Sequence, residues 1–169
     1  QQLHREAFGL ALNMSYDYGF ATLTSVTGYR EGEAYSVYDQ TGIGPSNPFG
    51  ITLPLLFRSP VREREEINQF TQELRLVSPE QDERGFDFII GGYYQHDEVS
   101  KDDIISFEIA VPAIPTLNGQ SAWFNEGTNE AFAIFGQLGY RFSEKFRVVG
   151  GVRYSRDEKS GVVRGLALE

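Results

Sequence analysis

The sequence of 169 residues contains no cysteine, and this absence removes several classes of chemistry. Without thiols there are no disulfides, no thiol catalysis and few of the usual structural zinc sites. Positive charge is also scarce, because 15 Lys and Arg stand against 24 Asp and Glu and leave a net charge of −9. Nucleic-acid binding needs clustered Lys and Arg, so this balance gives it no support.

Long hydrophobic runs are missing as well. No stretch of about 18 apolar residues exists, so no transmembrane helix is expected. Strands that cross a membrane alternate apolar with polar residues and escape such a search, so a membrane protein is not excluded. The first six residues, QQLHRE, lack an initiator Met and lack a charged head followed by an apolar stretch. We therefore expect no signal peptide and a chain that is mature or cut out of something longer.

Aromatic residues and glycine are abundant, with 13 Phe, 9 Tyr and 18 Gly, and this composition favours β-structure. Apolar residues recur at every second position in six segments, which is the main signal of a half-buried strand. These segments cover about residues 6–17, 20–30, 66–77, 86–97, 130–142 and 146–157. Each has roughly 11 residues, twice the usual strand length and enough to cross a bilayer at a tilt.

The connections alternate between short and long. Short polar turns follow the first, third and fifth segments, whereas residues 31–65 and 98–129 form long insertions punctuated by Pro and Gly. Outer-membrane barrels have this rhythm of short periplasmic turns and long outside loops. The expected fold is therefore all-β: an antiparallel transmembrane β-barrel segment of about six long strands in up-and-down hairpins, with short periplasmic turns and long extracellular loops.

The two faces of these strands have different chemistry. Arg on the lipid side would cost about 2 to 4 kcal/mol near the bilayer midplane, so the apolar face should point to lipid. The residues expected to face lipid are Phe8, Leu10, Leu12, Phe70, Leu74, Phe88, Ile90, Ile134, Leu138, Tyr140, Val148 and Val152. The residues expected to face the lumen are Glu73, Arg75, Gln137, Arg141, Arg147 and Arg153. In the second segment, whose pattern is less clear, we expect Leu23, Thr27 and Tyr29 to point outward.

Aromatic residues gather near the strand ends, for example Phe142 with Phe146 and Tyr93 with Tyr94, as in the girdles of a membrane barrel. Alternation alone does not show which face of the strands is exposed to water. A soluble β-sandwich or a lipocalin-like binding barrel, with the apolar face inward, therefore remains the alternative.

Three stretches of the sequence resemble the barrel region of TonB-dependent outer-membrane receptors. The first is QELRL at 72–76 with Ser78-Pro79 and, after a polar turn, FDFIIGGYYQHDE at 86–98. The second is AIFGQLGYRFSEKFRVVGGVRYSRDEK at 133–159, and the third, weaker, is TLTSVTGYR at 22–30. They cover about half of the chain and are scaffold motifs, so they carry little information on the ligand.

The resemblance implies a 22-stranded barrel around an N-terminal plug, in the bacterial outer membrane. It also implies nutrient uptake, of ferric siderophores or a similar scarce ligand, with energy from the TonB complex. No plug and no TonB-contacting segment are recognised, so residues 1–169 are expected to be a partial barrel of a larger receptor. Expected partners are outer-membrane lipid, the missing plug and remaining strands, the TonB complex through that plug, and a small ligand such as an iron chelate.

Ligand contacts are expected in two unusually apolar loops, residues 43–58 and 109–124. Aromatic and Arg side chains are favoured at recognition hot spots. The candidate contacts are Phe49, Phe57, Arg58, Trp123 and Phe124. As an alternative, these loops pack on one another or on the plug.

No catalytic residues, metal site or cofactor are expected. The run His96-Asp97-Glu98, with Asp102 and Asp103 nearby, could suggest a metal site. Consecutive residues of a strand point to opposite faces, however, so the triplet cannot converge on one ion. The sequence has only two His and no nucleophile elbow or phosphate-binding loop.

Overall fold

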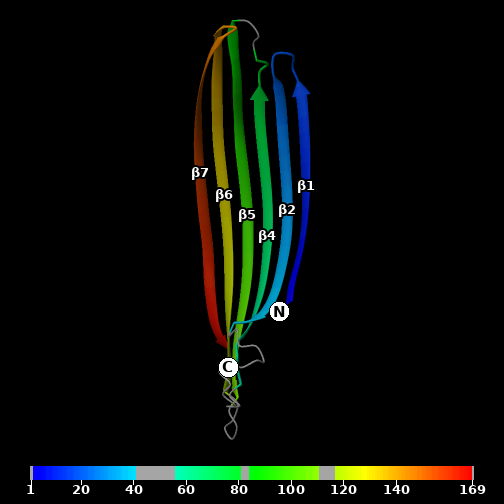
Figure 1. Cartoon of the computed structure of the whole chain (residues 1–169), viewed down its shortest axis with the longest axis vertical. Helices are drawn as coiled ribbons and strands as arrows, with labels where there is room; N and C mark the ends of the chain where they lie inside the picture. Colours follow the sequence, from blue (N-terminus) through cyan, green and yellow to red (C-terminus); the bar gives the residue numbers. More distant parts are fainter. Residues whose placement is uncertain (1, 41–55, 81–83, 111–116, 169) are drawn as a thin grey trace.

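The protein folds into one antiparallel β-sheet, seen in a computed structural model that describes residues 2–40, 56–80, 84–110 and 117–168 (Figure 1). Six long strands lie in the order β1-β2-β4-β5-β6-β7, and the short β3 pairs with β5. Their bounds are β1 Gln2–Asp17, β2 Thr22–Asp39, β3 Leu56–Arg58, β4 Pro60–Val77, β5 Gly85–Ala110, β6 Leu117–Ser143 and β7 Phe146–Leu168. This up-and-down arrangement confirms the expected fold class.

The connections after β1, β4 and β6 lie together at one end of the sheet, which we name the turn end. The first is tightened by Tyr18 N donating to Ala21 O at 3.0 Å, and Gly19 adopts φ 86° there. That left-handed conformation is accessible to Gly without a steric penalty. The connection after β4 closes where Ser78 N donates to Phe88 O at 2.9 Å. We name the opposite end of the sheet the far end.

The strands extend much further toward the far end than the sequence pattern predicts. The pairing of β5 with β6 runs without a register break from Gly85 opposite Arg141 to Ile109 opposite Leu117. The prediction that residues 98–129 form one long insertion is therefore wrong in its extent, because only residues 111–116 separate the two strands. Residues 31–39 and 60–65, also predicted as insertion, belong to β2 and β4. Figure 1 shows the β5–β6 pair reaching toward the far end.

The sheet is a single layer without a hydrophobic core among the described residues. The only apolar side chains that are buried there are those of Ala21, Val61, Ala122 and Ala133. Contacts between elements run between sheet neighbours, and no second layer packs on either face in the described ranges. We name the two faces after neighbouring residues of β6, the Leu138 face and the Gln137 face.

Candidate functional site: the two faces of a barrel wall

Residues that pair directly across two antiparallel strands point to the same face of the sheet. The register therefore sorts the predicted residues without reference to their chemistry. Leu138 pairs with Phe88 and Gly150, while Gln137 pairs with Ile89 and Gly151. When these pairings are followed across all six long strands, the twelve residues predicted to face lipid all lie on the Leu138 face. The six residues predicted to face the lumen all lie on the Gln137 face.

The Leu138 face carries an uncovered apolar band next to the turn end. Leu10, Ile134 and Val152 are 63%, 52% and 76% exposed. Soluble monomers rarely expose a continuous apolar area that reaches across six strands. Beyond the band, toward the far end, the same face turns polar at Asn68, Glu98, Thr128 and Ser160, which pair in one row across four strands.

Aromatic rings border the apolar band on both sides. At the turn end, Tyr140 lies 4.4 Å from Phe86 and 4.6 Å from Phe142 between ring centroids. At the other border, Phe70 and Tyr94 lie 6.4 Å apart and Phe132 pairs with Tyr94. Phe142 and Phe132 are ten residues apart on β6, roughly 33 Å along the strand. At a tilt of about 40° this gives roughly 25 Å, the height of the apolar band of an outer-membrane barrel.

The Gln137 face is polar even where the opposite face is apolar. At the turn end, Arg147 donates to both carboxylate oxygens of Asp87, which is buried, and Arg141 pairs with Glu80. Further along, the guanidinium of Arg153 lies 5.8 Å from the centre of the Phe135 ring, within cation–π range. Arg141, Arg147 and Arg153 are therefore held in place by ion pairs and a ring.

An amide network crosses the middle of the Gln137 face. Asp97 accepts hydrogen bonds from Gln69, Gln95 and Asn129 at 2.9, 2.6 and 2.9 Å. The three donors come from β4, β5 and β6, so the carboxylate links three strands by hydrogen bonds. All three of these hydrogen bonds are made within the protein, which indicates a structural role.

At the far end, a second polar cluster on the Gln137 face joins β2, β4 and β5. Glu63 accepts hydrogen bonds from Ser36 at 3.0 Å, from Tyr38 at 3.1 Å and from Lys101 at 3.4 Å. Lys101 Nζ also lies 3.3 Å from Asp103 Oδ1. Burial raises the pKa of Glu63, but the hydrogen bonds from Ser36 and Tyr38 and the charge of Lys101 outweigh it and hold the pKa below its usual value.

Lys101 has a pKa above its usual value. Burial lowers it, but the hydrogen bonds and charges of Asp103 and Glu63 outweigh this effect. The pKa of Tyr38 is raised, chiefly because its hydroxyl donates to Glu63. At neutral pH Glu63 is therefore a carboxylate, Lys101 an ammonium and Tyr38 a protonated phenol.

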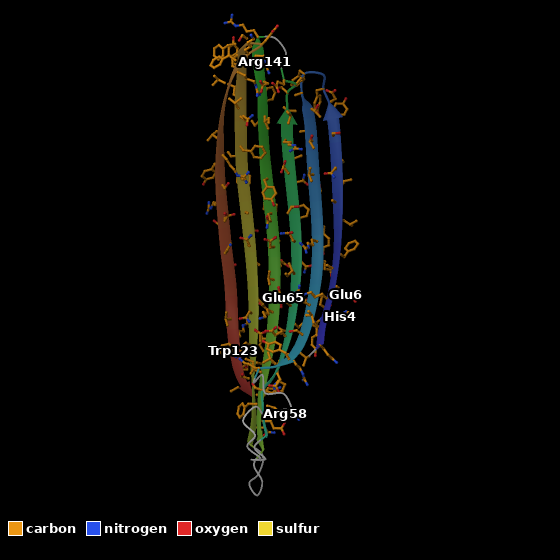
Figure 2. The ribbon with its side chains drawn as sticks, viewed as in Figure 1. His4, Glu6, Arg58, Glu65, Trp123 and Arg141 are labelled. Carbon is orange, nitrogen blue, oxygen red and sulfur yellow. The ribbon has the colours of Figure 1, made fainter. Side chains whose placement is uncertain are left out.

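The predicted ligand contacts are distributed differently from expectation. Trp123 and Phe124 lie in β6 and not in a loop, so their side chains point to opposite faces. Trp123 pairs with Asp103 on the Gln137 face, whereas Phe124 pairs with Asp102 on the Leu138 face. Phe57 and Arg58 belong to β3, and Phe49 lies outside the described residues. In Figure 2, Trp123 and Arg58 lie toward the far end and Arg141 at the turn end.

The run His96-Asp97-Glu98 is divided between the two faces, as the strand geometry predicts. His96 lies 3.3 Å from Glu98 and 3.3 Å from Glu130 on the Leu138 face, while Asp97 joins the amide network on the other. Within the described ranges, no group of three or more His, Asp or Glu side chains is placed to hold a metal ion. In the same part of the chain, no helix has the length and hydropathy to cross a membrane.

Sequence reasoning missed Glu63 and Lys101 as members of one site. The two residues lie 38 positions apart in the sequence, and neither stands in a motif that links them. Their contact depends on the β4–β5 register, in which Glu63 pairs with Asp103 and Glu65 with Lys101. Only a correct strand assignment for residues 60–65 and 98–105 could have brought them together.

A long-stranded antiparallel sheet with a band of exposed apolar side chains, two aromatic borders and a polar opposite face defines the wall of a transmembrane β-barrel. A model of the family described as TonB dependent receptor-like, beta-barrel matches residues 2–166. The chain therefore belongs to this family of receptors, which lie in the bacterial outer membrane and are not enzymes.

Comparison with solved structures supports the same fold. The ferric yersiniabactin uptake receptor FyuA from Yersinia pestis superposes with a TM-score of 0.69 at 20% sequence identity. The match covers 96% of this chain and 22% of that receptor, so the chain spans about a fifth of its length. Among curated proteins, none matches this sequence.

Proposed function

We propose that this chain is part of the barrel of an outer-membrane receptor that takes up a scarce small molecule, such as a ferric siderophore, with energy from the TonB complex. Further strands would complete the barrel, and a plug inside it would contact the TonB complex. The proposal is supported by membership of the family and by the likeness to a receptor for ferric yersiniabactin. The observation that carries it is the opposition between the exposed apolar band and the charged Gln137 face.

In this proposal the Leu138 face meets lipid and the Gln137 face meets the lumen. Each strand would leave the outer leaflet where the Leu138 face turns from Phe70 and Tyr94 to Asn68 and Glu98. The turn end is then periplasmic and the far end extracellular. A soluble sandwich is the poorer explanation, because no described segment covers the apolar band.

We also propose that ligand contacts lie at the far end of the lumen face. Phe49, Phe57 and Trp123 remain the candidates, whereas Arg58 pairs with Glu108 on the Leu138 face and is proposed for the exterior. Phe124, on the Leu138 face beside Asp102, is also proposed for the exterior of the extracellular wall. The lumen-facing arginines Arg75, Arg141, Arg147 and Arg153 lie nearer the periplasm and are proposed to contact the plug.

Uptake by cells tests this function. Cells that carry the full receptor should accumulate a radiolabelled ferric chelate from a panel of hydroxamates and catecholates, and cells without the receptor should not. Deleting TonB should leave binding at the surface intact and abolish accumulation. Accumulation that is independent of the receptor or of TonB for every chelate would refute the proposed function.

A further inference from the structure

The Gln137 face contains a hollow of about 320 Å³ at the far end, which we name the Glu63 hollow. Tyr38, Glu63, Asp103, Trp123 and Asn125 contribute to its lining, together with apolar atoms of Val61 and Ile105. The lining residues come from β2, β4, β5 and β6, and three of these strands are joined by the hydrogen bonds of Glu63. The hollow therefore lies on paired strands, whose register fixes the positions of its carboxylates.

Three of the hydrogen-bond donors around the hollow are already engaged with the protein. Tyr38 Oη donates to Glu63, Lys101 Nζ donates to Glu63, and Asn125 Nδ2 donates to the backbone oxygen of Lys101 at 3.3 Å. Asp103 Oδ1 lies 3.3 Å from Lys101 Nζ, and no other described group donates a hydrogen bond to it. A carboxylate oxygen has two lone pairs, so Glu63 can accept more bonds than it has. The hollow is matched to a group that donates hydrogen bonds.

The charge of the hollow also favours a group that donates hydrogen bonds. Glu63 and Asp103 carry two negative charges, and Lys101 between them supplies one positive charge. The lowered pKa of Glu63 keeps that carboxylate ionised at neutral pH. The indole of Trp123 is 44% exposed beside them, and the face of an indole attracts cations more strongly than other aromatic rings do. An anionic group would meet repulsion here, whereas an alkylammonium would meet carboxylates and a ring.

We propose that the Glu63 hollow binds the cationic, ammonium-bearing part of the ligand at the outer mouth of the receptor. This inference rests on the proposed function and adds the charge class of the ligand. Glu63 and Asp103 would accept the N–H bonds of the ammonium, Trp123 would cover its methylene groups, and Lys101 would hold the two carboxylates apart.

Matched probes and matched variants test the inference in the purified full receptor. The probes are a ferric trihydroxamate that bears one free primary amine and the same chelate with the amine acetylated. The native receptor should bind the amine form about tenfold more tightly. Asp103→Asn and Glu63→Gln should each abolish that preference. Asp102→Asn, at the adjacent residue on the opposite face, should retain it.

The outcomes separate the inference from the proposed function. Equal affinity for the two probes, or equal behaviour of Asp103→Asn and Asp102→Asn, would overturn the inference while leaving TonB-dependent uptake intact. Failure of both probes to bind would also overturn it, and the uptake panel would decide the function independently. Folding of each variant is verified by its unheated mobility on a gel, and Glu63→Gln provides a second reading if Asp103→Asn fails to fold.

Discussion

Arg147 of β7 donates hydrogen bonds from Nε and Nη2 to the two carboxylate oxygens of Asp87 of β5, at 3.1 and 2.5 Å. The ion pair lies directly above Gly139 of β6, the strand between them. A Cβ on Gly139 would lie 2.5 Å from Asp87 Oδ1 and 2.8 Å from Arg147 Nη2. Only a residue without a side chain leaves room for this bridge. One ion pair thus joins β5 and β7 across β6 at the turn end.

Replacing Gly139 by Ala should push the bridge apart and lower the thermal midpoint by roughly several degrees, since Asp87 would keep its burial but lose its partner. The midpoint can be followed by the heat-induced mobility shift of the folded barrel. Gly136→Ala is the matched control, because a Cβ there would lie 3.8 Å from Ile89 O, at ordinary contact distance. Equal midpoints for the two variants would show that the bridge is dispensable.

Gly91 should be equally sensitive for a different reason. A Cβ at this residue would lie 2.5 Å from Phe135 Cζ and 2.8 Å from the backbone oxygen of Leu74, so both a ring and the neighbouring strand would have to move. Gly91→Ala should therefore lower the free energy of unfolding by about 1–3 kcal/mol, as overpacking does. Gly92→Ala, with 3.7 Å to Ala133 O, should stay close to the native value in urea unfolding from lipid.

The assignment of faces is tested by placing the same charge on each side of β6. Ile134→Arg should destabilise the barrel by about 2–4 kcal/mol, because its side chain would enter lipid near the middle of the apolar band. Gln137→Arg, three residues away on the opposite face, should be tolerated beside Gly151 and Arg153. Folding yield into lipid vesicles measures both variants. Equal tolerance would refute the proposal that the Leu138 face meets lipid.

Six strands and their two faces could be predicted from the sequence because one face is apolar beside the turn end. Leu138, Ile134 and Val152 stand out against Gln137 and Arg153, and this contrast is the period-two signal. Leu23, Thr27 and Tyr29 of the less regular second strand share the Leu138 face with the residues predicted to face lipid. The alternating pattern therefore depends on one face being in contact with an apolar medium, and it carries no information on backbone pairing.

The same reasoning explains why the far end was not predicted. Along β5, from Glu98 to Asp103, and along β6, from Asn125 to Glu130, polar side chains occupy both faces, so no alternation is visible. Polar residues on both faces remove the contrast, while the backbone pairing continues unchanged. The Glu63 hollow lies in this region, which is why sequence reasoning placed Trp123 in a loop and left Lys101 without a role.

The ionic cluster at the far end predicts a dependence on pH. The pKa of Glu63 is lowered, so its stabilising effect is present above the ordinary value of 4.5 and is lost as the pH falls through the lower folded value. The pKa of Lys101 is raised, so its effect is present below 10.5 and is lost as the pH rises through the higher folded value. The cluster should be intact between these limits.

Trp123 reports this titration, because it lines the same hollow and is the single Trp of this sequence. Its emission should change in acid, below about pH 4.5, and the change should disappear in Glu63→Gln. Glu66→Gln, on the opposite face of β4, should titrate like the native chain. An identical acid response in all three would show that Glu63 does not govern the cluster.

The continuous pairing of β5 with β6 as far as Ile109 and Leu117 has a thermodynamic consequence for recognition. Side chains carried on a flexible loop must be ordered when a ligand binds, at a cost of roughly 0.5–1.5 kcal/mol for each immobilised side chain. Here the backbone is already ordered by strand pairing, in the part of the sheet that we propose lies outside the bilayer. A molecule arriving from the medium would therefore meet a rigid surface already shaped for it, and its residence time would depend on contacts and not on the folding of a lid.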